Sequence, residues 1–399
     1  MCPIHEWKLE TISLPFLVKT LSDNDPSWTY GDDYSVVTEL PKATWISEGK
    51  GYASKIYSVQ ISVGPKTHSI VIKILSTSIQ LGQDGSNSDY NNQDKKVEHS
   101  NMLALAHNRE LDFYTISSAF VHMKIPKFIS GQKVECGNQG FLLMEDLSTR
   151  AKSDFNVARG LTLEQAKSLI EQMCVLQIQS LGIADLEKNF CQINVLIGAV
   201  AEYSRSCVEI IASKKYEWFD AGRAKEVLSW TSADQFSWII SAKKEFEMPP
   251  VLVHQDLWPG NILWEIGNSE NQTESTESDD RMLAIVDWQN CHAGSFTSDL
   301  AAIIGVNSSG CLRQEHENEL LDFYIQRMSD LSQLCSQAKN IRLNKSNVNA
   351  SYKISLKCAV LQMAMTLVTN PTHDEIPANE SEGPLTQRFR QLIEDIFIA

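Results

Sequence analysis

Two short apolar runs in the second half of the chain end in groups that could bind a metal ion and phosphate. Residues 251–261, VLVHQDLWPGN, pass from an apolar run into an H-x-D-x-x-x-x-N loop, and residues 284–289, AIVDWQ, carry an aspartate after a second run. If both runs are buried strands, they deliver Asp256, Asn261 and Asp287 to one point. Phosphoryl transfer of the kinase type needs such groups: Asp256 to accept a hydroxyl proton, Asn261 and Asp287 to hold Mg²⁺ beside a nucleotide's phosphates.

The loop between Val253 and Ile262 must fold back for this to work. Pro259 and Gly260 occupy the central positions of a predicted type II turn, which would return Asn261 to the side of Asp256. We interpret His254 as a residue that braces the loop by hydrogen bonding rather than one that reacts. A lone H-x-D is unremarkable among nine histidines, so the signal lies in the full pattern with its flanking strands and the later aspartate.

An upstream lysine and glutamate would complete this chemistry. Lys73 lies in SIVIKIL, where the plain alternative is an edge-strand lysine that faces solvent. A strand lysine that contacts the α- and β-phosphates needs an acidic partner on the following helix, expected over residues 97–117. Glu110 lies among apolar residues of that helix, and Glu98 is the competing choice. We favour Glu110, because a carboxylate on an inward-leaning face is better explained by a lysine partner than by solvent.

Two further segments could contact the nucleotide. Gly49 and Gly51 in SEGKGYAS give the G-x-G start of a phosphate-covering hairpin, with Ser54 where a third glycine often lies. A lone G-x-G is more often an ordinary turn, but its place just before the strand of Lys73 favours the phosphate role. Glu145 follows another buried strand, where a segment connecting two lobes would present backbone groups to adenine.

The hydrophobic periodicity changes from strand-like to helix-like along the chain. Residues 162–165, TLEQ, form a capping-box signature at the start of the helical part. We expect an N-terminal extension over 1–43, a nucleotide-binding N-lobe over 44–147, and a C-lobe with the catalytic loop and substrate pocket over 148–399. Expected strands are 44–47, 55–62, 69–75 with a turn at Gly64-Pro65, 125–130, 132–136 and 141–144; expected helices include 14–21, 193–213, 221–230, 232–246, 315–334, 352–368 and 385–397.

Composition excludes several classes of partner. The 399-residue chain has a formal net charge of −15 and no block of Lys and Arg, which argues against nucleic acid and against an anionic membrane. Nine cysteines without a CxxC pair, and an N-terminus that resembles neither a signal peptide nor a membrane span, predict a cytoplasmic protein with free thiols. We assign no function to the acidic, Ser-rich residues 268–280.

The motifs HQDLWPGNILW and IVDWQNCHAGSFTSDLA resemble those of the choline kinase and aminoglycoside phosphotransferase superfamily, most closely its CHK kinase-like, ecdysteroid kinase-related group. SEGKGYASK and NRELDFY are similar to that group as well. The resemblance implies an α+β, protein-kinase-like two-lobed fold with a small β-rich N-lobe and a larger, mainly helical C-lobe. It also implies Mg²⁺ and ATP in a cleft and transfer of the γ-phosphate to a small-molecule hydroxyl. Asp299, in the DLA motif, would support the catalytic loop by hydrogen bonding.

Some positions depart from the superfamily pattern. Gln255 stands where glycine is frequent, and Trp288 and Gln289 depart from some members, although DWQ suits the nearest group. A protein kinase is excluded by spacing, because Asp299 follows Asp287 without room for a long activation segment.

We therefore expect a steroid, glycoside or other hydroxylated metabolite or xenobiotic as acceptor. A choline- or ethanolamine-type kinase and a non-catalytic nucleotide-binding pseudokinase stay open as alternatives, as do the acceptor's identity, the choice between ATP and GTP, and the oligomeric state.

Overall fold

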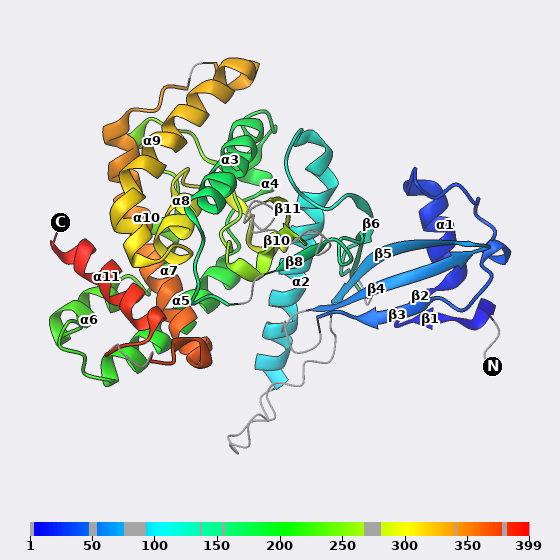
Figure 1. Cartoon of the computed structure of the whole chain (residues 1–399), viewed down its shortest axis with the longest axis horizontal. Helices are drawn as coiled ribbons and strands as arrows, with labels where there is room; N and C mark the ends of the chain where they lie inside the picture. The colour runs from blue at the N-terminus through cyan, green and yellow to red at the C-terminus, as the bar shows by residue number, and fades with distance from the viewer. Residues whose placement is uncertain are drawn as a thin grey trace, which may run out of the picture. The chain divides into compact units, whose positions relative to one another are not determined.

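The computed structural model describes residues 4–47, 54–75, 93–135, 138–153, 156–266, 281–339, 341–376 and 381–398. Gly49, Gly51 and the acidic segment 268–280 lie outside the described residues. The chain divides into two compact units, the first formed by residues 1–118 and 126–150 and the second by residues 119–125 and 151–399. Figure 1 shows strands dominating the first unit and helices the second, which confirms the predicted α+β class with a β-rich N-terminal part and a mainly helical remainder.

The first unit is built on a five-stranded antiparallel sheet in the order β3-β4-β5-β7-β6. Its long central hairpin turns at Gly64, whose φ of +58° suits glycine, so the Gly64-Pro65 turn is confirmed. The elements of this unit are β1 (Lys8–Leu9), β2 (Ile12–Ser13), α1 (Leu14–Asn24), β3 (Lys42–Trp45), β4 (Ser54–Val63), β5 (Lys66–Leu75), α2 (Gln93–Ile116), β6 (Phe128–Gln132) and β7 (Phe141–Glu145).

Helix α1 packs onto this sheet and shares its core. The Ser13 side chain caps the helix, and Pro15 stands in its first turn, where a missing N–H costs nothing. Leu14 and Leu17 are fully buried in one cluster with Ile72 of β5. Residues 1–43, expected as an extension, therefore contribute apolar side chains to the core of the first unit.

The strand expected over 132–136 is wrong beyond Gln132. The Asn108 side chain of α2 bonds both backbone groups of Val134, accepting from its N–H at 2.8 Å and donating to its carbonyl at 3.3 Å. These bonds replace the partner that a neighbouring strand would supply, so β6 ends at Gln132.

The second unit packs helices around two small antiparallel sheets, β11-β10-β8 and β12-β9. The predicted capping box is present, with Thr162 and Gln165 bonding each other's backbone N–H at the start of α3. Its elements are β8 (Ala151–Ser153), α3 (Leu163–Ser180), α4 (Leu186–Asn189), α5 (Asn194–Ser213), α6 (Ala221–Ser229), α7 (Ala233–Ile240), β9 (Val251–Val253), β10 (Ile262–Glu265), β11 (Met282–Ile285), β12 (His292–Gly294), α8 (Ser298–Ala301), a π-helical turn (Ala302–Val306), α9 (Gly310–Leu334), α10 (Lys345–Thr369) and α11 (Pro384–Ile398).

The helix expected over 232–246 is too long, because α7 ends at Ile240. The Lys243 ammonium turns back to donate to the carbonyls of Trp238 and Ser241, which stand at the end of the helix. A lysine in this place adds a donor to carbonyls at the C-terminal end of a helix, which fits the end of α7 here.

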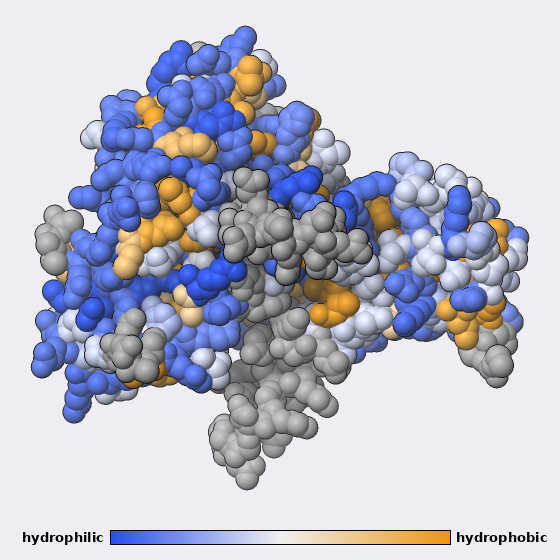
Figure 2. Space-filling view, viewed as in Figure 1, coloured by the Kyte–Doolittle hydropathy of each residue, from blue (hydrophilic) through white to orange (hydrophobic). Residues whose placement is uncertain are grey.

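The surface agrees with the acidic, polar composition. Figure 2 shows a helical unit that is mainly hydrophilic in this view, interrupted by small separate hydrophobic areas. In the part of the chain that the structure describes, no helix is both long enough and apolar enough to span a membrane.

Candidate active site

In the first unit the structure brings Lys73 and Glu110 together. Lys73 Nζ on β5 lies 2.6 Å from Glu110 Oε2 on α2, and the two side chains are only 8% and 2% exposed. Glu98, the competing partner on the same helix, is exposed. The carboxylate of Glu110 therefore fixes the position of the Lys73 ammonium.

Of the other residues predicted to contact nucleotide, the structure describes Ser54 and Glu145. Ser54 begins β4, while Gly49 and Gly51 lie outside the described residues. Glu145 ends β7, where its carboxylate forms an ion pair with Arg150 and accepts the Lys127 backbone N–H at 3.2 Å. The Glu145 carboxylate and its backbone N–H, which donates to the Lys127 carbonyl at 2.9 Å, thus both serve the strand end.

The neighbouring Asp146 was missed by the sequence reasoning. It accepts hydrogen bonds from the Ser58 and Ser69 hydroxyls at 2.6 and 2.5 Å. Burial alone would raise the pKa of this carboxyl, but these bonds together with those from Ser148 lower it. Asp146 therefore anchors the chain just after β7 to the central hairpin as a charged acceptor.

In the second unit the H-x-D-x-x-x-x-N loop begins where β9 pairs with β12. The His254 ring is fully buried, and its Nε2 donates to the Val286 carbonyl at 3.0 Å while its Nδ1 accepts the Asp256 backbone N–H at 3.2 Å. These partners fix the neutral tautomer with hydrogen on Nε2. Both ring nitrogens are therefore bonded to backbone groups, an arrangement suited to bracing the loop.

Asp299 on α8 holds the start of the same loop. Its two carboxylate oxygens accept the backbone N–H groups of His254 at 2.8 Å and Gln255 at 2.9 Å. Burial raises the pKa of Asp299 to about 6, against the opposing effect of these two bonds. Gln255 itself has a φ of +66°, an uncommon backbone conformation for a residue other than glycine.

The turn that follows corrects the type II prediction. Pro259–Asn261 form a 3₁₀ turn, closed by a 2.9 Å bond from the Asn261 N–H to the Trp258 carbonyl. A type II turn needs positive φ at Gly260, which does not have it. A Cβ at Gly260 would lie 2.3 Å from the Trp258 ring, so any other residue would force that ring to move. Glycine suits position 260 because the Trp258 ring packs closely against it, and not because the backbone is left-handed there.

The turn nevertheless brings Asn261 beside the Asp256 backbone. Asn261 Nδ2 donates to the Asp256 carbonyl at 2.9 Å, which leaves Oδ1 as the amide atom that could bind a metal ion. Ile262 of β10 pairs with Ile285 of β11, and the Val286 N–H donates to the Asn261 carbonyl at 3.0 Å. This register places Asn261 beside the segment that leads directly into Asp287.

The Asp287 carboxylate and the Asn261 amide oxygen could bind a magnesium ion that also binds phosphate. Asp287 has a left-handed backbone, φ 67° and ψ 61°, and a partly exposed side chain. Among the described residues, no group of three or more His, Cys, Asp or Glu is arranged to hold a metal ion. Mg²⁺ is usually bound by one or two carboxylates together with substrate phosphates and water, so one carboxylate and one amide oxygen suit it.

Two asparagines in the site were missed by the sequence reasoning. Asn290 Nδ2 lies 3.4 Å from Asp256 Oδ2, and Asn307 Nδ2 donates to the Leu257 carbonyl. Asn290 stands in the quoted DWQN motif, which was the available signal. Asn307 follows the π-helical turn and carried no sequence signal, because its partner lies 50 residues earlier.

Comparison with known proteins places the chain in a family. A family model described as "Uncharacterized oxidoreductase dhs-27", DUF1679, matches residues 32–399. The protein of that name from Caenorhabditis elegans is 23% identical over 281 residues, 69% of this chain and 33% of that protein, so the chain spans about a third of that relative's length.

Solved structures similar to the chain include a choline kinase and a putative aminoglycoside phosphotransferase. A choline kinase from Cryptosporidium parvum is 14% identical, with 96% of this chain and 94% of that chain covered and a TM-score of 0.46. A putative aminoglycoside phosphotransferase from Ralstonia eutropha is 12% identical, covers 90% of this chain and 95% of its own, and has a TM-score of 0.45. The match over residues 32–399 shows that the chain belongs to the DUF1679 family.

Proposed function

We propose that this protein is an ATP-dependent phosphotransferase that transfers the γ-phosphate to a hydroxyl of a small molecule. The observation that carries the proposal is the loop of Asp256, whose fold-back brings Asn261 beside Asp256 and whose strand register leads to Asp287. The acceptor would be a steroid, a glycoside or another hydroxylated metabolite or xenobiotic, and the protein would act in the cytoplasm.

Each group would have a defined task. Asp256 orients the acceptor hydroxyl and takes its proton late, because positioning dominates in a loose transition state. Lys73, held by Glu110, steadies the α- and β-phosphates, and the segment from Gly49 to Ser54 covers the γ-phosphate. Asn261 and Asp287 would hold Mg²⁺, which neutralises phosphate charge when bound.

His254 and Asp299 would serve the same reaction without touching the reacting atoms. They bond the backbone of residues 254–256 from two sides, so the Asp256 side chain projects from a segment with little freedom to move. Such positioning matters because a displacement of about 1 Å can cost on the order of 100-fold in rate.

The word oxidoreductase in the relative's name does not assign a reaction to this chain, because the chain covers only 33% of that protein. A dinucleotide-binding domain of the doubly wound type has a mostly parallel sheet. Every ladder between named strands of the described residues is antiparallel instead. Phosphoryl transfer is therefore the reaction that we test first.

The test is a screen with γ-³²P-ATP and Mg²⁺ against sterols, glycosides, aminoglycosides, choline and ethanolamine. We expect label in a hydroxylated acceptor with the wild-type chain and none with Asp287→Asn, the control for contaminating kinases. Label in choline or ethanolamine alone would favour the amine-kinase alternative. ATP binding without transfer to any acceptor would favour a pseudokinase.

A further inference from the structure

Three successive backbone carbonyls, those of residues 255–257, each accept a hydrogen bond from a side-chain amide. Gln362 Nε2 donates to the first at 3.2 Å, and Asn261 Nδ2 donates to the second at 2.9 Å. Asn307 Nδ2 donates to the third. About two-thirds of protein hydrogen bonds join two backbone groups, so a run of three side-chain donors sets this segment apart from a helix or a sheet. The position of the loop therefore depends on a few amide side chains.

The peptide group that precedes Asp256 is held at both of its polar atoms. Its oxygen belongs to Gln255 and accepts from Gln362, while its N–H belongs to Asp256 and donates to His254 Nδ1 at 3.2 Å. The direction of a Cα–Cβ bond is set by the peptide groups on either side of it. The hydrogen bond from Gln362 thus bears directly on where the Asp256 carboxylate points.

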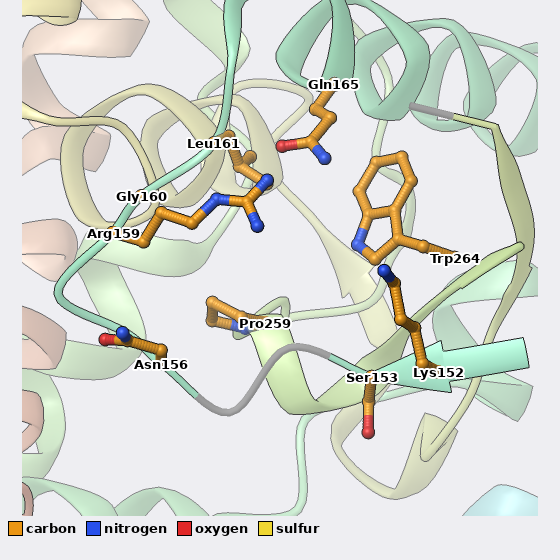
Figure 3. A pocket seen from close by; sticks show the side chains of 9 residues that line it. All are labelled: Lys152, Ser153, Asn156, Arg159, Gly160, Leu161, Gln165, Pro259 and Trp264. Atoms are coloured by element: carbon orange, nitrogen blue, oxygen red, sulfur yellow. The ribbon is translucent and has the colours of Figure 1, made fainter. Parts of the chain in front are cut away.

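The amide of Asn307 is itself held in place. The residue is 1% exposed, its N–H donates to the Ala302 carbonyl at 3.0 Å, and its carbonyl accepts the Leu161 N–H at 2.7 Å. Figure 3 shows Leu161 lining the same cavity as Pro259, which stands in the 3₁₀ turn of the loop. With both of its backbone groups bonded, Asn307 offers the loop a donor in a fixed position.

The two amides belong to elements that pack closely on each other. Gln362 lies on α10, and Asn307 directly follows the π-helical turn. A Cβ at Gly305, within that turn, would lie 3.0 Å from the Cβ of Ala359 on α10. Glycine therefore allows the turn to approach the helix, which fixes the separation of the two donors. Turns of this kind are frequent at functional sites.

We propose that Gln362 and Asn307 are positioning residues for phosphoryl transfer at Asp256; this inference rests on the proposed function. They are assigned no contact with the reacting atoms, but they hold the carbonyls on either side of the Asp256 carbonyl. The carboxylate then meets the acceptor hydroxyl in one orientation. A displacement of about 1 Å can cost on the order of 100-fold in rate, so loss of either amide should slow transfer more than it weakens ATP binding.

The first test is hydrogen exchange of the full chain, followed by mass spectrometry in peptides that cover residues 252–262. Gln362→Met keeps an unbranched side chain on α10 without its amide, and Asn307→Ala removes the other donor. Each variant should speed exchange in these peptides by about tenfold or more, the effect of one lost buried hydrogen bond on local opening.

Asn347→Ala is the matched control, because Asn347 Nδ2 on the same helix donates at 3.2 Å to the carbonyl of Phe246, outside the loop. It should leave exchange in residues 252–262 unchanged. Unchanged exchange in Gln362→Met or in Asn307→Ala would overturn the role of that residue. Equal acceleration in every peptide of the chain would also overturn it, because that result marks a general loss of stability.

The second test separates rate from binding with the acceptor that becomes labelled in the γ-³²P-ATP screen. In both variants kcat should fall about 10- to 100-fold, while the KM for ATP stays within about twofold of wild type. A raised KM for ATP with an unchanged kcat would overturn the positioning role. If the wild-type chain labels no acceptor, the proposed function fails, whereas the exchange measurement still decides whether the two amides hold the loop.

Discussion

The buried carboxylate of Asp299 accepts the backbone N–H of Gln255, a residue in the left-handed region of φ, at 2.9 Å. The neighbouring His254 N–H occupies the other carboxylate oxygen. A single side chain thus sets the backbone just before Asp256, and its protonation state has consequences for the whole unit.

We predict that Asp299 makes stability fall as pH rises from about 4 to about 6. Burial raises its pKa to about 6 in the folded chain from an ordinary 3.8. Between these values the unfolded chain has lost the proton while the folded chain keeps it, so rising pH favours unfolding. The contribution is present below pH 3.8 and lost above 6, and the difference of about two pKa units corresponds to about 3 kcal/mol.

The measurement is urea denaturation of wild type and Asp299→Asn across this pH range. The free energy of unfolding of wild type should decline by about 3 kcal/mol relative to the variant between pH 4 and pH 7. Asp234→Asn, an exposed aspartate in the first turn of α7, is the control. Parallel pH profiles for wild type and Asp299→Asn would contradict the prediction.

Removal of Glu110 should destabilise the chain through Lys73. Glu110→Ala leaves the Lys73 ammonium buried without its carboxylate, which typically costs about 3–5 kcal/mol. The double variant Lys73→Met/Glu110→Leu should lose less, since neither charge is left behind.

Glu98→Ala on the same helix is the matched control, with an expected effect within about 0.5 kcal/mol because Glu98 is exposed. Urea denaturation gives all three values. If Glu98→Ala were as destabilising as Glu110→Ala, the pairing drawn from the geometry would be mistaken.

Asp256→Asn should abolish turnover and leave ATP binding intact. An amide cannot accept the hydroxyl proton, and loss of a general base typically lowers the rate by about 100- to 10,000-fold. The ATP affinity, measured by calorimetry, should be unchanged, because the nucleotide contacts are assigned to other residues. Normal turnover by the variant would refute the role of Asp256.

Magnesium should be required for nucleotide binding to stabilise the fold. With Mg-ATP at about one hundred times its Kd, the free energy of unfolding should rise by about 2.7 kcal/mol. Addition of EDTA, or the Asp287→Asn substitution, should remove most of this gain in a thermal-shift experiment. Equal stabilisation by ATP with and without magnesium would argue against Asn261 and Asp287 as its ligands.

Local pattern was sufficient to predict the groups that lie close together in sequence or on facing elements. Alternating apolar residues and the Gly64 turn gave the central hairpin, and the aliphatic neighbours of Lys73 placed it in a buried strand. Glu110 could be chosen over Glu98 because more apolar residues of the expected helix surround Glu110. In each case the deciding residues fall within a few positions of one another.

The supports of the Asp256 loop could not be predicted in this way. Asn307 and Gln362 bond the backbone of Leu257 and Gln255 across 50 and 107 residues. Nothing within a few residues of either side chain marks it as a partner, because the contact exists only once the helices have packed. The turn at Gly260 was predicted, but its type was wrong for a related reason: a Cβ at this position would lie 2.3 Å from the Trp258 ring, whereas Gly260 has no positive φ.

The left-handed backbone at Gln255 bears on how this position can vary among relatives. A non-glycine residue in that conformation costs about 1–2 kcal/mol, so the backbone here would suit glycine better than glutamine. In this chain the Gln255 amide reaches Cys358 Sγ at 3.3 Å, and Gln362 donates to the Gln255 carbonyl at 3.2 Å. Glutamine at position 255 thus has a less favourable backbone conformation than glycine would have, but its side chain attaches the loop to α10. Substitutions at positions 255, 358 and 362 should therefore be inherited together rather than drift independently.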